Sequence, residues 1–183
     1  MNPLSDNALM LKVKNGDLDK LGLLFERYHR ALFGFIFHMT GQRELSEDMV
    51  QNVFYRVLKY KHTFRGDGEF KTWIYHLARN VINDNGRSIK RTVRHQELTE
   101  YTENIGGGFA ADEPMHKKQE LATLRNAMAN LNEESREILI LSKFQELKYQ
   151  EIAQIMDITE GAVKVRVHRA IGQLKNMYLQ IAN

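Results

Sequence analysis

The sequence predicts an all-α protein: two small helical domains joined by a flexible acidic linker, with a helix-turn-helix in the second domain. Three observations support this class. Apolar residues recur every three or four positions along most of the 183-residue chain, which is the spacing of helix faces. The chain contains only two prolines, and no segment has a convincing strand pattern. One stretch, 97–113, has a composition unlike the segments on either side of it.

In the first domain, helical spacing runs from Leu21 to Met39, and Gly41 is predicted to end that helix. We expect Ser46 to be the N-cap of the next helix, which places Asp48 in its first turn, where the helix dipole favours anions. The loop "FRGDGEF" then leads into a third helix. The predicted buried stripes of the second and third helices are Met49, Val50, Val53, Phe54 and Val57, and Phe70, Trp73, Ile74, Leu77, Ala78 and Val81.

The linker is predicted from "ELTEYTENIGGGFAADE", residues 97–113. This stretch holds five acidic residues, no basic residue and three consecutive glycines, which are features of a flexible connection. We therefore place the domains at 1–95 and 115–183 and the linker at 96–114. Both domains are long enough to fold alone.

In the second domain, Asn132 is predicted to cap one helix, and "YQEIAQIMDI" is predicted to form a short one. A tight turn at Asp157–Ile158 follows, and Thr159 is the expected N-cap of a longer helix. The apolar positions of that helix are 163, 167, 170, 174, 177 and 181, a spacing that keeps them on one face. A short helix, a tight turn and a longer helix together form a helix-turn-helix.

The outward face of the last helix is the first candidate DNA-binding surface. Glycines allow a close approach of the backbone, cations can contact phosphates or guanine acceptors, and an outward valine can contact a thymine methyl group. A solvated basic face is the alternative, but it does not explain an outward valine between glycines. The residues predicted to face DNA on this helix are Gly161, Lys164, Val165, His168 and Arg169.

A second basic face lies on the third helix of the first domain, where residues 71–94 include six Lys or Arg and one Asp. An ordinary amphipathic helix would explain this pattern equally well. We expect Phe64 and Arg65, in the preceding loop, to contact an unpaired base, and Trp73 to belong to the core. The predicted polar face is Thr72, His76, Arg79, Asn80, Asn83, Arg87 and Lys90.

Other classes of function lack support in the sequence. The chain has no cysteine, and none of its seven histidines lies three or four positions from another, so we expect no metal site and no cofactor. The sequence contains no glycine-rich phosphate loop and no nucleophile–base pair. We therefore expect that the protein is not an enzyme and has no small-molecule substrate. The start "MNPLSDNALM" does not resemble a secretory signal, and the longest apolar run, "ALFGFIF", is too short to span a bilayer, so we expect a cytoplasmic protein.

Two segments resemble a known family. "LSEDMVQNVFYRVLKYKHTFRGDGEFKTWIYHLARNVINDNGRSIKR" resembles the promoter-melting domain of bacterial extracytoplasmic-function sigma factors. "LNEESREILILSKFQELKYQEIAQIMDITEGAVKVRVHRAIGQLK" resembles their C-terminal helix-turn-helix domain. The two matches occur in the order of that family and cover most of both predicted domains.

This resemblance implies a protein that binds core RNA polymerase, at the β′ clamp coiled coil and the β flap, and directs it to promoter DNA. The C-terminal domain would recognise the −35 element, and the N-terminal domain would recognise and melt the −10 element. The segment "EDMVQNVF" would contact the clamp, and helical projection places Asp48, Gln51, Asn52 and Tyr55 outward. Asn52 departs from the family, which often has an acidic residue there. The family also implies an anti-sigma factor, often anchored in the membrane.

Two alternatives to this interpretation differ in what they require. A helix-turn-helix regulator with an N-terminal helical sensor lobe should have a ligand pocket and should dimerise. A helical nucleic-acid enzyme would need carboxylates or histidines that face one cleft, and the sequence offers none.

Overall fold

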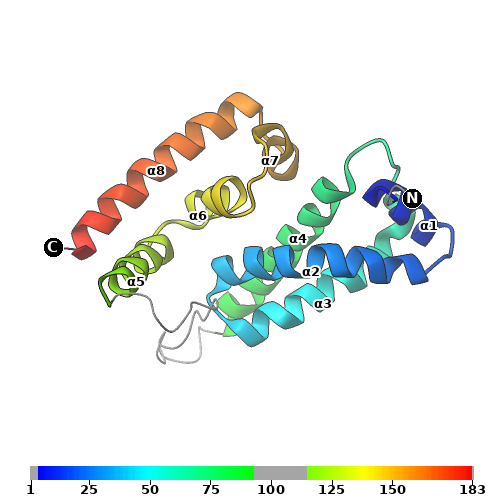
Figure 1. The fold of residues 1–183 in the computed structure, drawn as a ribbon, viewed down its shortest axis with the longest axis horizontal. Helices are drawn as coiled ribbons and strands as arrows, with labels where there is room; N and C mark the ends of the chain where they lie inside the picture. The colour runs from blue at the N-terminus through cyan, green and yellow to red at the C-terminus, as the bar shows by residue number, and fades with distance from the viewer. Residues whose placement is uncertain (1–3, 93–114, 183) are drawn as a thin grey trace. The chain divides into compact units, whose positions relative to one another are not determined.

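A computed structural model describes residues 4–92 and 115–182, with side chains described at 4–86 and 119–182. All secondary structure elements in these ranges are helices, which confirms the predicted all-α class (Figure 1). Contacts within the chain divide it into two compact units, Met1–Tyr101 and Thr102–Asn183. The predicted linker, 96–114, lies outside the described residues, and the two units are therefore considered separately.

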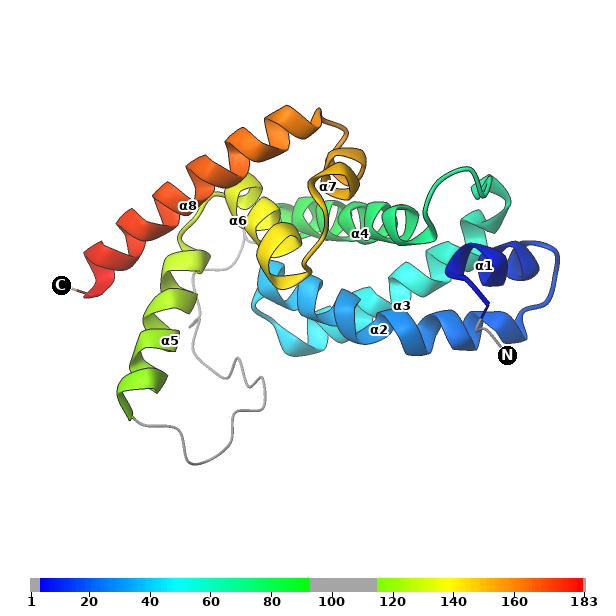
Figure 2. The same ribbon diagram turned by 45° about the horizontal axis from the view of Figure 1, so that its top comes forward.

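The first unit is a bundle of three long helices with a short helix against one end. Helices α2 (Asp19–Thr40), α3 (Arg43–Tyr60) and α4 (Phe70–Thr92) lie side by side in both views (Figures 1 and 2). Helix α1 (Asp6–Lys14), which the sequence pattern did not predict, contacts α2, α4 and the 3-10 turn η1 (Lys61–Thr63). Every long helix contributes to one core, which includes Leu9, Val13, Leu32, Phe35, Val53, Val57, Ile74 and Ala78.

The turn between α2 and α3 confirms one predicted boundary and corrects another. Gly41 adopts the left-handed conformation (φ 71°) and donates its N–H to Phe37 O at 2.8 Å, so it ends α2 as predicted. The prediction that Ser46 caps α3 is wrong, because α3 begins at Arg43. Ser46 is buried inside the first turns, where its hydroxyl lies 2.5 Å from Gln42 O and 2.9 Å from Thr40 Oγ1. It closes the turn between the two helices.

The second unit is built around its longest helix. Helix α8 (Glu160–Ala182) contacts α5 (Met115–Ala129), α6 (Glu133–Leu139) and α7 (Tyr149–Met156). A π-helical turn, Ile140–Phe144, follows α6 and was not predicted. Gln145 N donates to Ile140 O at 2.9 Å across that wider turn. The core of this unit includes Ile138, Leu139, Ile140, Leu141, Ile152, Ile155, Val163 and Val167.

The helix-turn-helix is present with the predicted boundaries. Asn132 Oδ1 accepts from Ser135 N at 2.8 Å, and Thr159 Oγ1 accepts from Ala162 N at 3.1 Å, so both predicted N-caps are confirmed. Asp157 ends α7 in the left-handed conformation, with φ 54° and ψ 50°. The turn between α7 and α8 is therefore defined by the left-handed conformation of Asp157 and by the Thr159 side chain, which caps the first turn of α8.

Candidate nucleic-acid interface

The first half of α8 has the register that the sequence predicted, whereas Ile181, which was predicted to share the apolar face, is 40% exposed. Val163 and Val167 are 0% and 2% exposed, whereas Val165 is 49% exposed. Burial of the Val165 side chain would stabilise the fold, so its exposure leaves that stabilisation unused. The remaining predicted residues of this face, Gly161, Lys164, His168 and Arg169, are all exposed as well.

The cations of α8 divide into two groups. The Arg166 guanidinium pairs with the Glu134 carboxylate of α6, which fixes it within the unit. Lys164 and Arg169 form no ion pair with any side chain described at 4–86 and 119–182. Both side chains are exposed near Val165 on the outer face of the helix. This face can therefore attract a polyanion through Lys164 and Arg169.

The two glycines of α8 are not required by the fold. A Cβ atom added at Gly161 or Gly172 would meet no heavy atom within 4 Å, and both glycines have ordinary helical backbone angles. Glycine in a helix interior destabilises the helix by about 0.8–1.0 kcal/mol relative to alanine. Packing within the unit therefore does not explain why glycine stands at these positions. An external surface that approaches this backbone closely would explain both positions.

The polar face of α4 borders an open hollow in the first unit. The hollow has a volume of about 400 Å³. Asn80 and Asn83 are exposed at its edge, whereas His76 and Arg79 are partly buried. On one side, Arg56 Nη2 lies 2.8 Å from Asp84 Oδ2. The full lining consists of Arg56, Tyr60, Thr63, Leu77, Asn80, Asn83 and Asp84.

Sequence reasoning missed part of this hollow. It identified Asn80 and Asn83 but not Tyr60, an aromatic residue at the end of α3 that is still 37% exposed. An aromatic side chain beside amide groups can stack on a base while the amides form hydrogen bonds to the base edge. The side chains of Arg87 and Lys90, which were also predicted for this face, lie outside those described.

Two predictions for the −10 surface need correction. Phe64 is only 3% exposed, and its ring centroid lies 5.4 Å from that of Trp73 and 6.0 Å from that of Phe70. It fills the core beneath the loop, so it is not a surface for base stacking. Thr72 is 8% exposed and faces inward. Arg65 is exposed, as predicted.

The third candidate surface is the outer side of α3. Asp48, Gln51, Asn52 and Tyr55 are all exposed, and Tyr55 is 63% exposed. Asn52 Oδ1 accepts from Arg56 Nε at 3.2 Å, and Arg56 also lines the hollow beside α4. The outer side of α3 and the polar face of α4 are thus linked through one arginine.

Within residues 4–86 and 119–182, no three His, Cys, Asp or Glu side chains gather in a way that could hold a metal ion. Among the described helices, none has the length and apolar character needed to cross a bilayer.

A helix-turn-helix in the second unit, with Lys164 and Arg169 exposed near Val165 on its longer helix, has the arrangement of a DNA-binding domain. Family models agree and are more specific. Sigma-70 region 2 matches residues 24–92, and Sigma-70 region 4 matches residues 121–174.

Curated relatives identify the same family. The RNA polymerase sigma factor YlaC of Bacillus subtilis (strain 168) is 30% identical over 161 residues, which are 86% of this chain and 91% of YlaC. The ECF RNA polymerase sigma factor SigM of the same organism is 31% identical, over 85% of this chain and 93% of SigM. The chain therefore belongs to the extracytoplasmic-function family of RNA polymerase sigma factors, and the alternative of a regulator with a sensor lobe is not favoured.

Two solved structures share the fold. CnrH in complex with the cytosolic domain of CnrY gives a TM-score of 0.71 at 20% identity, over 94% of this chain and 96% of CnrH. The sigma factor RpoE of Bartonella quintana, in complex with the anti-sigma factor NepR, gives a TM-score of 0.69 at 21% identity, over 85% of this chain and 94% of RpoE.

Proposed function

We propose that this sigma factor uses three separate surfaces for its three tasks. The outer side of α3 binds core RNA polymerase, the polar face of α4 acts on the −10 element, and the outer face of α8 recognises the −35 element. The observation that supports this division is the exposure of polar and aromatic residues on helices whose opposite sides are core. The domain limits that we propose are 1–95 and 115–183, with 96–114 as the linker.

At the −35 element, α8 enters the major groove with its N-terminal part against the bases. Lys164 and Arg169 supply the donors that match guanine O6 and N7, and Val165 contacts a thymine methyl group. Gly161 lets the first turn approach the DNA backbone without a side chain in between. The cap at Thr159 and the buried Val163 hold this turn in place.

At the −10 element, the hollow beside α4 receives a base released from the duplex. Tyr60 offers a stacking surface, and Asn80 and Asn83 offer amide groups to the edge of the base. His76, Arg79 and Arg87 lie along the same helix and contact the strand, and Arg65 does so from the preceding loop. Binding an unpaired base here favours the melted promoter over the duplex, because the duplex keeps that base stacked.

The polymerase-binding surface combines one charge, two amides and one aromatic ring. Tyr55 supplies the apolar part of this surface, because a tyrosine that is 63% exposed gains much from burial in an interface. Asp48, Gln51 and Asn52 supply polar groups in the preceding turns of α3. The protein contributes binding and no catalytic chemistry of its own, since the polymerase carries out the reaction.

An anti-sigma factor is part of this proposal. CnrH and the Bartonella quintana RpoE were each solved with a bound partner, which is named as an anti-sigma factor in the second case. We infer that a partner of that kind covers the exposed faces of this chain and releases them on a signal. The chain would then act in the cytoplasm, where its polymerase and promoters are.

The experiment that tests this division compares two double variants in reconstituted holoenzyme. Asn80→Ala with Asn83→Ala should leave the first binding of promoter DNA nearly intact but reduce permanganate reactivity of unpaired thymines. Lys164→Ala with Arg169→Ala should weaken the first binding and relax discrimination among single-base −35 variants, because base contacts are lost. If the asparagine variant melts promoters as the parent does, the −10 assignment is wrong.

A further inference from the structure

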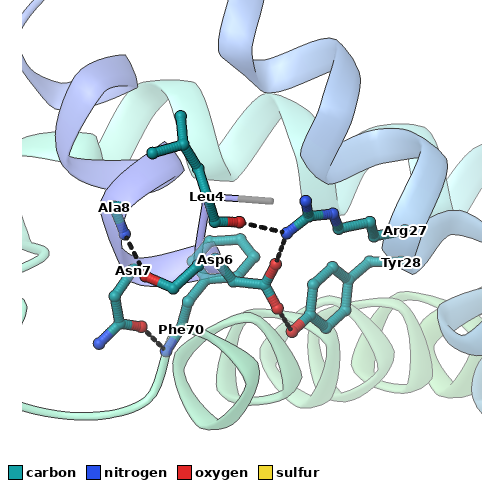
Figure 3. Close-up of polar contacts among 8 residues, drawn as sticks. Leu4, Asp6, Asn7, Ala8, Arg27, Tyr28 and Phe70 are labelled. Atoms are coloured by element: carbon teal, nitrogen blue, oxygen red, sulfur yellow. Dashed lines mark hydrogen bonds and ion pairs between the residues drawn. The ribbon is translucent and has the colours of Figure 1, made fainter. Parts of the chain in front are cut away.

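The loop between η1 and α4 is held by α1 at its distal end. Asn7 uses both halves of its side-chain amide. Nδ2 donates to Gly68 O at 2.9 Å. Oδ1 accepts from Phe70 N at 2.7 Å (Figure 3). These partners lie 61 and 63 residues further along the chain. One side chain thus fixes the end of the loop and caps the first turn of α4.

The same helix holds the proximal end of the loop. Lys14 Nζ donates to Phe64 O at 2.6 Å. Between the two ends, Gly66 has φ +83°, and a Cβ there would lie 3.4 Å from the Leu11 side chain. The backbone of 64–69 therefore rests on α1 along its length, while the Arg65 side chain is exposed.

Helix α1 is itself anchored firmly enough to serve as a support. Leu9, Met10 and Val13 are fully buried. The Asp6 carboxylate accepts the Tyr28 hydroxyl at 2.6 Å and pairs with the Arg27 guanidinium (Figure 3). Movement of α1 would break contacts with the core, so the loop is fixed to a rigid part of the unit.

We propose that Asn7 and Lys14 are positioning residues for base discrimination at the −10 element. They fix the backbone of loop 64–69 through Gly68 and Phe64, and they do not touch DNA themselves. A loop with glycines at 66 and 68 would otherwise let Arg65 adapt to a changed base, whereas a fixed backbone holds it in one position that only the matching base fits. The proposal rests on the proposed role of this loop and of Arg65 at the melted element.

The test uses variants that remove one hydrogen bond each. Asn7→Asp keeps an acceptor for Phe70 N, so α4 stays capped, but it replaces the donor to Gly68 O with an oxygen. Lys14→Met removes the donor to Phe64 O, and Lys14→Arg restores a donor. Matched controls are Lys12→Met in α1 and Asn15→Asp at its C-cap, which make the same changes in exposed side chains.

Each holoenzyme is assayed for open-complex formation on templates with single-base changes in the −10 element. A second readout is acrylamide quenching of Trp73, the only tryptophan in the chain, whose ring packs on Phe64. We expect Asn7→Asp to lower the ratio between the best and the changed templates by roughly fivefold, the factor that corresponds to one neutral hydrogen bond, and Lys14→Met to lower it at least as much, because its donor is charged. Acrylamide quenching of Trp73 should increase in both variants. Lys14→Arg should restore much of the parent's ratio between the best and the changed templates.

In all variants, binding of core polymerase and of −35 duplex should stay at the parent level. Both control variants should also keep the parent's discrimination and quenching. Parent-like discrimination by either Asn7→Asp or Lys14→Met would overturn the proposal. A failure of the proposed function appears differently: Arg65→Ala would then leave promoter melting and discrimination unchanged, whatever the α1 variants do.

Discussion

Two neighbouring valines in α8 give a sharp test of the helix register. Val163 is 0% exposed and Val165 is 49% exposed, although they are two residues apart and chemically identical. Val163→Ala removes two buried methyl groups, and transfer and cavity terms together predict a loss of about 2–3 kcal/mol. Val165→Ala removes exposed groups and improves helix propensity, so the change should lie within about 0.5 kcal/mol of zero.

Thermal unfolding followed by circular dichroism measures both effects. For a unit of this size, about 1 kcal/mol corresponds to about 4–8 °C in Tm, so Val163→Ala should lower the Tm of the second unit by roughly 10–20 °C. Trp73 lies in the first unit, and its fluorescence transition should not move in either variant. This separates a local loss of packing from a general loss of stability.

Val165→Glu completes the test on the DNA side. A carboxylate on the outer face would meet phosphates, so −35 binding by holoenzyme should fall while the Tm barely changes. If Val165→Ala or Val165→Glu destabilises the second unit as much as Val163→Ala does, the register of α8 is wrong. The assignment of its outer face to DNA would then fail as well.

Three further predictions follow from the other surfaces. Asp48→Arg should weaken capture of core polymerase in a pull-down and shift stability by under about 0.5 kcal/mol, and capture at the parent level would remove α3 as the docking face. Gly172→Ala should stabilise the second unit by about 0.8–1.0 kcal/mol in denaturant titration, since nothing opposes a Cβ there, whereas Gly161→Ala should weaken −35 binding in a gel-shift assay. Burial, together with the hydrogen bond to Asp6, raises the pKa of Tyr28 well above its ordinary value, so the folded state keeps this proton where the unfolded chain loses it. Stability of the first unit should therefore fall as pH rises above about 10, and denaturation of Tyr28→Phe should show a weaker alkaline dependence.

The elements that sequence predicted well have local signals. Gly41 ends α2 because glycine adopts the left-handed conformation without strain, and Asn132 and Thr159 cap helices with their own side chains. The valine pattern of α8 follows directly from helical periodicity. Each of these features depends on residues within one or two turns, which a single sequence contains.

The elements that sequence missed depend on distant partners. Phe64 follows η1 and has no periodic neighbours, and its burial comes from packing against Phe70 and Trp73. Ser46 looked like a cap because its position fits one, but Thr40 and Gln42 give its hydroxyl partners inside a helix that begins earlier. The role of Asn7 could not be predicted, since its partners lie more than 60 residues away.

The candidate site shows the same division. Exposure of Asp48, Asn80 and Val165 was predictable, because each follows from the stripe on the opposite side of its helix. The hollow that brings Tyr60 to Asn80 and Asn83 requires α3 and α4 to pack side by side. Periodicity gives the face of each helix but not which faces meet.

We infer that this chain directs polymerase to promoters through two DNA surfaces. The decisive measurement is transcription by purified core polymerase with this protein, from a library of templates randomised upstream of a fixed start site. We predict transcripts only when the protein is present, from templates enriched in two separate sequence blocks, one near −35 and one near −10. Enrichment of an inverted repeat bound without polymerase, and no dependence of transcription on the protein, would contradict it.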